Sequence, residues 1–383
     1  MMNKFNFDEI IVRRGTGSLK WDRNTQLEPF WVADMDFKSP PCLVEALQQR
    51  LNHGVYGYAI PHAGLTEAFI DYAKTRLSVD IEEEWLCPLG GLVPALSIAA
   101  QAYAKEGQSL MTSTPIYTPF LKVGRDAQLE TIGVAHIYNT DLSRWEMDWE
   151  SMEKNVQANT RLFLLSNPQN PLGRAFDRAE IIALAEFCER HDLILIADEI
   201  HCDLILDEAK TPHFSGLNLP EKLRERTVTL LSPSKTYNMA GIGFAYAVIP
   251  NVKLRNKFIL AKGCTQPEIN CFAYYAAEAA YRAGEPWRQE LLSYLRGNRD
   301  LLVETVNNQL PQIKIPVIEA TYLAWLDFSE TDFEKPAELL EKQGIFTAPG
   351  AWYGQEPALR INYACPRSKL ENLLEKLTIT FGS

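Results

Sequence analysis

Five short apolar runs, separated by longer polar and helical stretches, constrain the fold of this 383-residue chain more than any other feature. They are residues 109–111, RLFLLS at 161–166, LILIA at 193–197, TVTLLS at 227–232 and FAYAVI at 244–249. The stretch RAEIIALAEFCER at 178–190 has the apolar spacing of a helix. Strands that are apolar throughout, with helices between them, predict a parallel sheet covered on both faces. The ligands of such sheets bind at the carboxyl ends of the strands.

The C-terminal portion has a different pattern, and the chain is long enough for two or three domains. A helical stretch at 286–309 leads to IKIPVI and TYLAWLDF, then to a helix near 335–343, to LRINYA and to a final helix. This order predicts a smaller α+β domain. We expect an N-terminal segment, 1–48, that packs with the small domain, a large domain, 49–286, and the small domain itself, 287–383.

Composition narrows the class of protein. The net charge of −11 argues against nucleic acid as the main partner, because phosphate binding needs a basic face. We read no secretory signal and no run of about 18 apolar residues, so we expect no membrane span. The seven cysteines are scattered, odd in number and without a C-x-x-C pair, which favours reduced thiols in the cytoplasm. No spacing of histidines, cysteines and carboxylates indicates a metal site.

Three polar motifs each begin where a predicted strand ends. Asp198 in DEIHCD follows LILIA, Asn170 in NPQNPLGR follows RLFLLS, and Lys235 in SPSKTYN follows TVTLLS. Taken singly, an acidic pair is common at helix caps and Asn-Pro is common in turns. Placed on successive strands, the three side chains are expected to share one crevice. A lysine for a Schiff base, an acid that keeps a pyridine nitrogen protonated and a phosphate anchor are what pyridoxal phosphate requires.

A phosphate anchor is present in PLGGLVPAL, in which Gly90, Gly91 and Leu92 stand at a predicted helix start. Glycines there leave backbone N–H groups open, and a helix N-terminus favours an anion. The plain alternative is an ordinary loop that caps a helix. The hydroxyl groups of Ser232 and Ser234 are candidates for further donors.

With these motifs, the chain resembles the fold-type I pyridoxal-phosphate enzymes of the aspartate aminotransferase superfamily. The resemblance covers nearly the whole chain. Within this superfamily, the chain is similar to the MalY/PatB-type cystathionine β-lyases and related C–S lyases in four motifs: WVADMDF at 31–37, VYGY at 55–58, DEIHCDL and SKTYNMAG. The resemblance implies a large domain with a mainly parallel, seven-stranded sheet between helices, and a smaller α+β domain.

The resemblance also implies roles for single residues. Lys235 corresponds to the Schiff-base lysine and Asp198 to the partner of the pyridinium nitrogen. Asn170 corresponds to the donor to the cofactor's phenolic oxygen, and His201 stands where many relatives have a tyrosine that reaches the same oxygen. Tyr117 in TPIYTPF corresponds to the aromatic residue that stacks on the ring.

The resemblance implies further contacts around the substrate and the phosphate. Arg360 in LRINYACP is expected to bind the substrate α-carboxylate in a bidentate fork, with Ala33 and Asn170 nearby. Tyr58 is expected to reach the phosphate from the other subunit of a homodimer with shared active sites. Many relatives have an arginine eight residues after the lysine, and Gly243 occupies that position here. The pair Trp352–Tyr353 is interpreted as packing. Because the pair lies near Arg360 in sequence, lining the mouth of the site is the alternative role.

These features predict a C–S β-lyase that converts cystathionine, and cysteine or related thioethers, to a thiol, pyruvate and ammonia. An aminotransferase on the same scaffold is the alternative, because it shares the chemistry up to the loss of the Cα proton. A regulatory or binding protein that retains only the fold is a third reading, which the intact set of Lys235, Asp198 and Arg360 disfavours.

Overall fold

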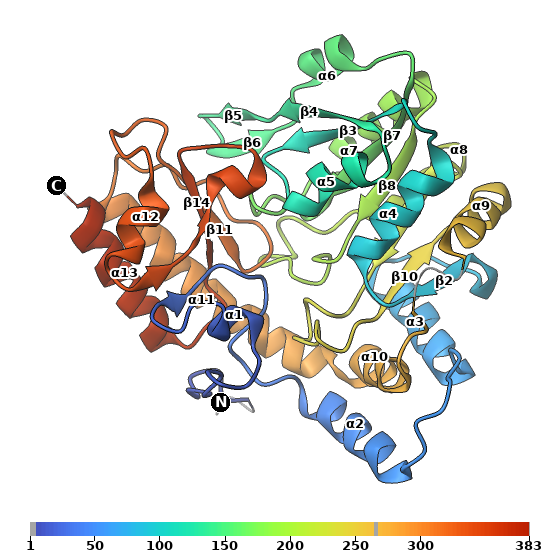
Figure 1. The fold of residues 1–383 in the computed structure, drawn as a ribbon, viewed down its shortest axis with the longest axis horizontal. Helices are drawn as coiled ribbons and strands as arrows, with labels where there is room; N and C mark the ends of the chain where they lie inside the picture. Colours follow the sequence, from blue (N-terminus) through green and yellow to red (C-terminus); the bar gives the residue numbers. More distant parts are fainter. Residues whose placement is uncertain (1–4, 264–266, 383) are drawn as a thin grey trace.

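A seven-stranded sheet forms the centre of the computed structural model, which describes residues 5–263 and 267–382 (Figure 1). Its strand order is β2-β10-β9-β8-β7-β3-β4. The strands are β2 (Leu86–Leu89), β3 (Ser109–Thr114), β4 (Glu130–Ala135), β7 (Thr160–Ser166), β8 (Ile194–Asp198), β9 (Thr227–Leu231) and β10 (Ala245–Val248). The five strands from β9 to β4 pair in parallel, and β10 runs antiparallel to both of its neighbours. The predicted fold class, a mainly parallel seven-stranded sheet between helices, is confirmed.

All five apolar runs are strands of this sheet, whereas β2 and β4 are the two edge strands that the runs do not include. β4 reads ETIGVA and has only one buried residue, Val134, so it lacks the uniform apolar character of an interior strand. β2 is four residues long and contains Pro88, which an edge strand tolerates. Edge strands therefore give the weakest sequence signal in a sheet of this kind.

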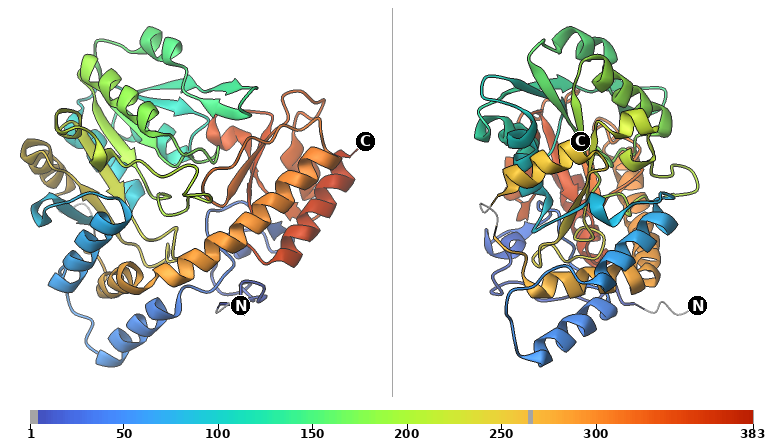
Figure 2. Two further views of the ribbon diagram at one scale, coloured as in Figure 1. Left: turned by 180° about the vertical axis from the view of Figure 1, so that it is seen from behind. Right: turned by 90° about the vertical axis from the view of Figure 1, so that its right-hand side faces the viewer.

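Alternate residues of each interior strand face helices on opposite sides of the sheet. On one side, Leu162 and Leu164 of β7 pack in a core with α4 (Leu92–Tyr103), α5 (Thr118–Asp126) and α9 (Val252–Lys262). On the other side, Phe163 and Leu165 pack with α6 (Trp149–Asn155), α7 (Arg178–Arg190) and α8 (Glu221–Arg224). The second side continues over α3 (Ala63–Arg76) and α10 (Cys271–Ala283). Figure 2 shows these helices from behind and from the side.

The C-terminal part packs helices against a three-stranded antiparallel sheet of order β11-β14-β13. Its strands are β11 (Leu323–Asp327), β13 (Ala348–Pro349) and β14 (Ala358–Asn362), and its helices are α11 (Glu285–Gln309), α12 (Pro336–Glu341) and α13 (Arg367–Phe381). α11 is the long orange helix of Figure 2, which runs from beside α10 to the C-terminal part. A separate small hairpin joins β5 (Ile137–Asn139) to β6 (Arg144–Glu146).

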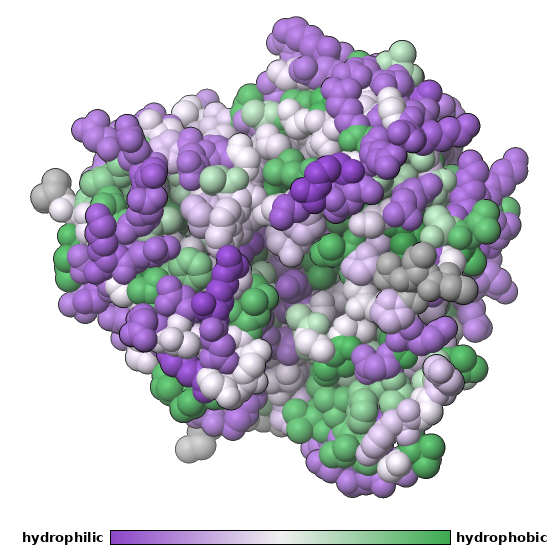
Figure 3. Space-filling model, in the orientation of Figure 1, coloured by the Kyte–Doolittle hydropathy of each residue, from purple (hydrophilic) through white to green (hydrophobic). Residues whose placement is uncertain are grey.

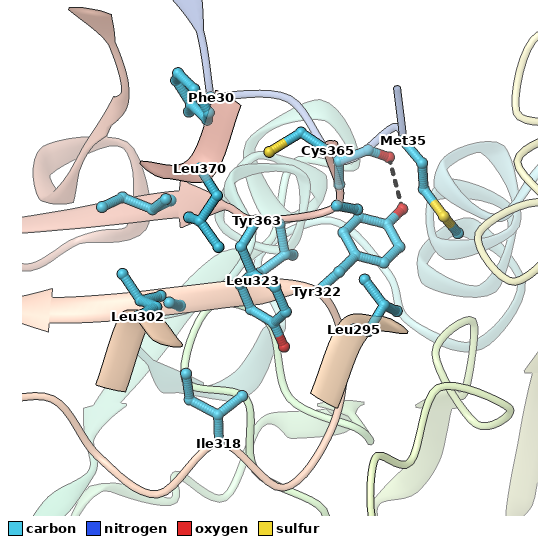
Figure 4. Close-up of a cluster of buried hydrophobic side chains, with 14 of the residues drawn as sticks. Phe30, Met35, Leu295, Leu302, Ile318, Tyr322, Leu323, Tyr363, Cys365 and Leu370 are labelled. Atoms are coloured by element: carbon cyan, nitrogen blue, oxygen red, sulfur yellow. Dashed lines mark hydrogen bonds between the residues drawn. The ribbon is translucent and has the colours of Figure 1, made fainter. Parts of the chain in front are cut away.

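The N-terminal segment contributes to the core of the C-terminal part. β1 (Glu28–Pro29) pairs in parallel with β12 (Ile345–Phe346). Phe30 lies in one buried cluster with Leu323 and Leu370 (Figure 4). α1 (Leu19–Asp22) and α2 (Pro41–His53) complete this segment. The division at 48 and 286 stays a prediction; residue 48 lies inside α2, and residue 286 lies in the first turn of α11.

Six of the seven cysteines are free thiols, and Cys264 lies outside the described residues. Within the described residues, no helix combines the length and the apolar character needed to cross a membrane.

A buried carboxylate ties α1 to the loop that follows β1. Asp36 accepts hydrogen bonds from Arg13 (2.7 Å), the Lys20 ammonium (3.0 Å) and the Trp21 indole (2.8 Å). Burial opposes the charge of Asp36, but Lys20, Trp21 and Arg13 outweigh it and hold the pKa of this carboxyl below its ordinary value. A lowered pKa means that this stabilisation is present above about pH 4 and is lost as the pH falls through the folded-state value.

We predict that Asp36→Asn lowers the free energy of unfolding by about 3 kcal/mol, because it leaves the fully buried Lys20 ammonium without its nearest carboxylate. Denaturant titration at pH 7 measures this change. Glu9→Gln is the control, because the exposed Glu9–Lys38 pair contributes at most about 1 kcal/mol. Equal effects of the two substitutions would contradict the assigned role of Asp36.

Candidate active site

A cavity of about 690 Å³ opens at the carboxyl ends of β7, β8 and β9. Residues from the N-terminal segment and from β14 form its remaining walls. Eleven of the thirteen residues predicted for the site line it: Ala33, Gly90, Gly91, Leu92, Tyr117, Asn170, Asp198, His201, Ser234, Lys235 and Arg360. Segments that are up to about three hundred residues apart in sequence therefore converge on one space, as the strand-end motifs indicated.

Lys235 follows β9 by four residues and directs its amine toward the N-terminal segment. The ammonium donates a hydrogen bond to the carbonyl of Ala33 at 2.7 Å. Desolvation lowers the pKa of Lys235 to about 8, and Arg360 adds to this effect, against the opposing charges of Asp34 and Asp198. A much larger fraction of this amine is therefore neutral near pH 8 than of an ordinary lysine.

Asp198 is the last residue of β8 and is buried. Burial raises the pKa of its carboxyl to about 7, and the adjacent Glu199 raises it further, although the Ile200 N–H donates to it at 3.0 Å. Such a carboxyl can remain charged at low cost only beside a cation. A protonated ring nitrogen would supply that cation.

His201 is buried beside these groups and is neutral. Burial, together with the charges of Lys235 and Arg360, lowers its pKa to about 3. Its Nδ1 has no hydrogen-bond partner among the described residues. A buried polar atom without a partner indicates a missing ligand or water.

Arg360 is brought from β14 to face Asn170. One terminal nitrogen of its guanidinium donates to Asn170 Oδ1 at 3.0 Å, and the other donates to the carbonyl of Trp31. The ring of Tyr353 lies 4.8 Å from the guanidinium carbon, and the Nε–H has no acceptor in the described part of the chain. The Tyr117 amide donates to the Asn170 carbonyl at 3.1 Å, which fixes this aromatic residue beside the same wall.

The glycines before α4 leave room for an anion. A Cβ atom at Gly90 would meet nothing within 4 Å, and one at Gly91 would meet only Pro94 at 3.8 Å. The helix start has no side-chain cap, so its backbone N–H groups are available to a phosphate. Gly243 has a φ of +70°, and a Cβ there would lie 2.7 Å from the Gly90 carbonyl oxygen. The position of the relatives' arginine is therefore used to pack the chain against the glycine loop.

Two predicted residues do not line the cavity. Ser232 is buried behind Ser234, and its hydroxyl donates to the Phe244 carbonyl at 2.6 Å. Tyr58 is fully exposed, on the segment between α2 and α3. The roles of both residues at the phosphate stay predictions.

The cavity also contains residues that sequence reasoning missed. Trp31 and Arg23 come from the N-terminal segment, and Lys122 comes from α5. Trp31 is the first residue of WVADMDF, so the motif itself was the available signal. Arg23 and Lys122 belong to no motif, and only the fold brings them to the site. Trp352 and Tyr353 line the cavity, as the alternative interpretation of this pair expected.

The residues present suit pyridoxal 5′-phosphate. The cavity offers an amine for an aldehyde, a buried carboxyl that makes no ion pair with a described residue, an aromatic ring, and free amides beside two glycines. The unpartnered Nδ1 of His201 and the open space at Gly90 and Gly91 are the observations that favour a bound group of this kind.

Comparison with known proteins gives the same result. The family model described as aminotransferase class I and II matches residues 29–377. The chain is 34% identical to the cystathionine beta-lyase PatB of Bacillus subtilis, over 97% of this chain and 98% of PatB. It superposes on the crystal structure of OvoB with a TM-score of 0.95 and 39% identity, over 99% of this chain and 100% of that one.

A further structural match contains the expected cofactor. Cystalysin from Treponema denticola, solved with pyridoxal 5′-phosphate, has a TM-score of 0.93 and 30% identity, over 98% of each chain. With the family model matched over most of the chain and with relatives above 30% identity, the chain belongs to the aminotransferase class I and II family and, within it, to the MalY/PatB-type subgroup.

Proposed function

We propose that this chain is a pyridoxal-phosphate-dependent C–S β-lyase that cleaves cystathionine and related thioethers to a thiol, pyruvate and ammonia. The observation that carries the proposal is the convergence of Lys235, Asp198 and Arg360 on one cavity. The kinship with the cystathionine beta-lyase PatB supports the lyase reaction in particular.

The cofactor would be held by residues from four parts of the chain. Asp198 would pair with its ring nitrogen, and Tyr117 would lie against the ring. Asn170 and His201 would face its phenolic oxygen. The amides at Gly90–Leu92 and the Ser234 hydroxyl would bind its phosphate. When bound, pyridoxal phosphate withdraws the electrons of the substrate Cα–H bond, which is the chemistry that β-elimination needs.

The protein's own side chains then position the substrate and move its proton. Arg360 is already oriented by Asn170 and Trp31, and its planar fork fits the α-carboxylate. Lys235 Nζ, in its neutral form, is the base that accepts the Cα proton, and its lowered pKa makes that form accessible near neutral pH. The thiol leaves from Cβ with the electrons of the C–S bond.

An aminotransferase would use the same cavity, and the family model carries that name. The two reactions diverge once the Cα proton is lost, and only the lyase produces pyruvate without a keto acid. Pyruvate formation in the absence of a keto acid therefore distinguishes the two functions.

We further infer a homodimer whose partner subunit supplies Tyr58. The support is the exposure of this residue within an apolar surface along α2 and the segment after it. The exposed residues of this surface are Val44, Leu51, Val55, Tyr56, Tyr58 and Ile60. Figure 3 shows an apolar patch over α2, at the lower right. Patches of this kind mark protein interfaces. We also infer a cytoplasmic location, for which free and mostly buried thiols are suited.

We predict that the holoenzyme releases pyruvate from cystathionine in the absence of any keto acid, and that Lys235→Ala abolishes this activity while the fold is retained. Coupled lactate dehydrogenase measures the pyruvate. Borohydride reduction should fix the cofactor to the peptide that contains Lys235. Keto-acid-dependent turnover without pyruvate would identify an aminotransferase, and a label on another lysine would refute the assignment.

We predict that Asp198→Asn lowers kcat by several orders of magnitude, because the amide cannot stabilise a protonated ring nitrogen. The amide can still accept the Ile200 N–H, so the local fold should persist. In the cofactor-free protein, by contrast, the same substitution should raise the free energy of unfolding. The raised pKa of Asp198 means that the folded chain loses stability as the pH rises from about 4 to about 7. The variant should therefore melt higher than the cofactor-free parent at pH 8. A loss of activity below tenfold would contradict the role.

We predict that inactive Tyr58→Ala and inactive Lys235→Ala subunits regain activity when they are mixed. In a mixed dimer with shared sites, one site carries both defects and the other carries neither. Each mixed dimer should therefore recover up to about half of the parental activity. Subunit exchange is monitored by mass spectrometry, and exchange without recovered activity would show that Tyr58 serves its own subunit.

A further inference from the structure

Arg23 stands at the mouth of the cavity, with its guanidinium stacked on two indole rings. The guanidinium carbon lies 4.7 Å from the ring centre of Trp31 and 5.5 Å from that of Trp352. The two indoles meet edge to face at 5.8 Å. Arg23 makes no side-chain hydrogen bond or ion pair with any of the described residues, so all of its guanidinium N–H donors are available. An arginine held by ring contacts alone leaves its planar fork free for a ligand.

The backbone at Arg23 is fixed by the short helix that it ends. Asp22 accepts N–H groups from Gly15, Gly17 and Ser18, which closes the loop before α1. The Trp31 indole donates to the Lys20 carbonyl at 3.1 Å. Together with the bonds of Lys20 and Trp21 to Asp36, these contacts hold Arg23 over its two rings. The cost of ordering the side chain is therefore largely met before a ligand binds.

Arg23 lies on the substrate side of the cavity. Its neighbour Trp31 accepts a hydrogen bond from Arg360 through the backbone, and its neighbour Trp352 precedes Tyr353, whose ring faces the Arg360 guanidinium. The predicted phosphate amides lie elsewhere, at the start of α4. Arg360 is expected to bind the α-carboxylate of the substrate. The part of the substrate nearest to Arg23 is therefore the end beyond the sulfur.

Lys122 adds a second cation to this side. The Thr118 hydroxyl donates to the Trp352 carbonyl, and Lys122 follows Thr118 by one turn of α5. Residues four apart share a helix face, so Lys122 lies on the face of α5 from which Thr118 bonds to Trp352. Lys122 lines the cavity and is exposed.

Among the described residues, four cations line the cavity, and two of them have no assigned partner. Lys235 and Arg360 are assigned to the cofactor and to the α-carboxylate, and the only acidic residue in the described lining is Asp198. Arg23 and Lys122 remain. We propose that Arg23, assisted by Lys122, is a specificity-determining residue that binds a carboxylate on the leaving thiol, so that carboxylated thioethers are preferred over uncharged ones of the same shape. This inference rests on the proposed lyase function and assigns a specificity residue to that same site.

Two matched pairs of thioethers test the proposal. S-carboxymethyl-L-cysteine is compared with S-ethyl-L-cysteine, and S-(2-carboxyethyl)-L-cysteine is compared with S-propyl-L-cysteine. Within each pair, only one compound carries a carboxylate on the leaving thiol. The Cβ–S bond that breaks is of the same kind in all four compounds. Arg23→Gln should lower kcat/KM for the better carboxylated thioether by at least about 10-fold, the low end for a charge-assisted contact. The uncharged partner should change by less than about twofold. Arg23→Lys should retain part of the preference, because it keeps the charge but not the fork.

Arg125→Gln is the control, because it removes the same charge from α5 outside the cavity, where Arg125 pairs with Asp126. It should leave both members of each pair unchanged. Equal losses for charged and uncharged thioethers in Arg23→Gln would show that Arg23 only supports the two tryptophans. The absence of any loss would also overturn the proposal.

A binding measurement separates this proposal from the lyase function. L-2-aminoadipate and L-norleucine have the shapes of S-carboxymethyl-L-cysteine and S-ethyl-L-cysteine but no leaving group. Calorimetric titration of the holoenzyme should show tighter binding of aminoadipate, and Arg23→Gln should remove that preference. If no thioether yields pyruvate but the preference is present and depends on Arg23, the reaction has been misassigned and the anion site stands. If pyruvate forms but the preference is absent, the anion site is wrong.

Discussion

Desolvation at the carboxyl edge of the central sheet is the constraint on which the site depends. Lys235 and Asp198 are both moved toward their neutral forms, with pKa values of about 8 and about 7. Each shift has a cost in stability that an empty cavity cannot recover, and a ligand that bears a carbonyl carbon and a protonated nitrogen relieves both. The same desolvation that shifts the pKa values of Lys235 and Asp198 in the apoprotein therefore also favours binding of the cofactor.

A short stretch of the N-terminal segment connects the parts of the molecule that carry these groups. The Ala33 carbonyl accepts bonds from Lys235 at 2.7 Å and from Tyr322 at 3.1 Å, and the Trp31 carbonyl accepts one from Arg360. Residues 31–33 therefore contact the sheet-bearing part and the C-terminal part at once. Because the contacts are made by the backbone, they depend on the path of the chain more than on side-chain identity. Asp36 and its three donors hold that path in place.

Much of the fold and of the site was predictable because the signals were local. Each interior strand is an uninterrupted apolar run, and Asp198, Asn170 and Lys235 each stand where a run ends. The edge strands escaped detection because their residues are half-exposed. Arg23 and Lys122 escaped because no local pattern distinguishes a cation that lines a cavity from one that faces solvent. Tertiary packing decides their place. The Arg23 guanidinium lies over the ring of Trp352, and α5, which carries Lys122, bonds to the Trp352 backbone through Thr118.

The contact between Gly243 and the Gly90 carbonyl has a consequence for how members of this family differ from one another. An arginine at 243 would need both a left-handed backbone, which side chains disfavour, and space that a carbonyl oxygen occupies at 2.7 Å. An arginine could therefore be accommodated at 243 only if the loop at Gly90 moved as well. We expect the residue at 243 and the path of this loop to change together.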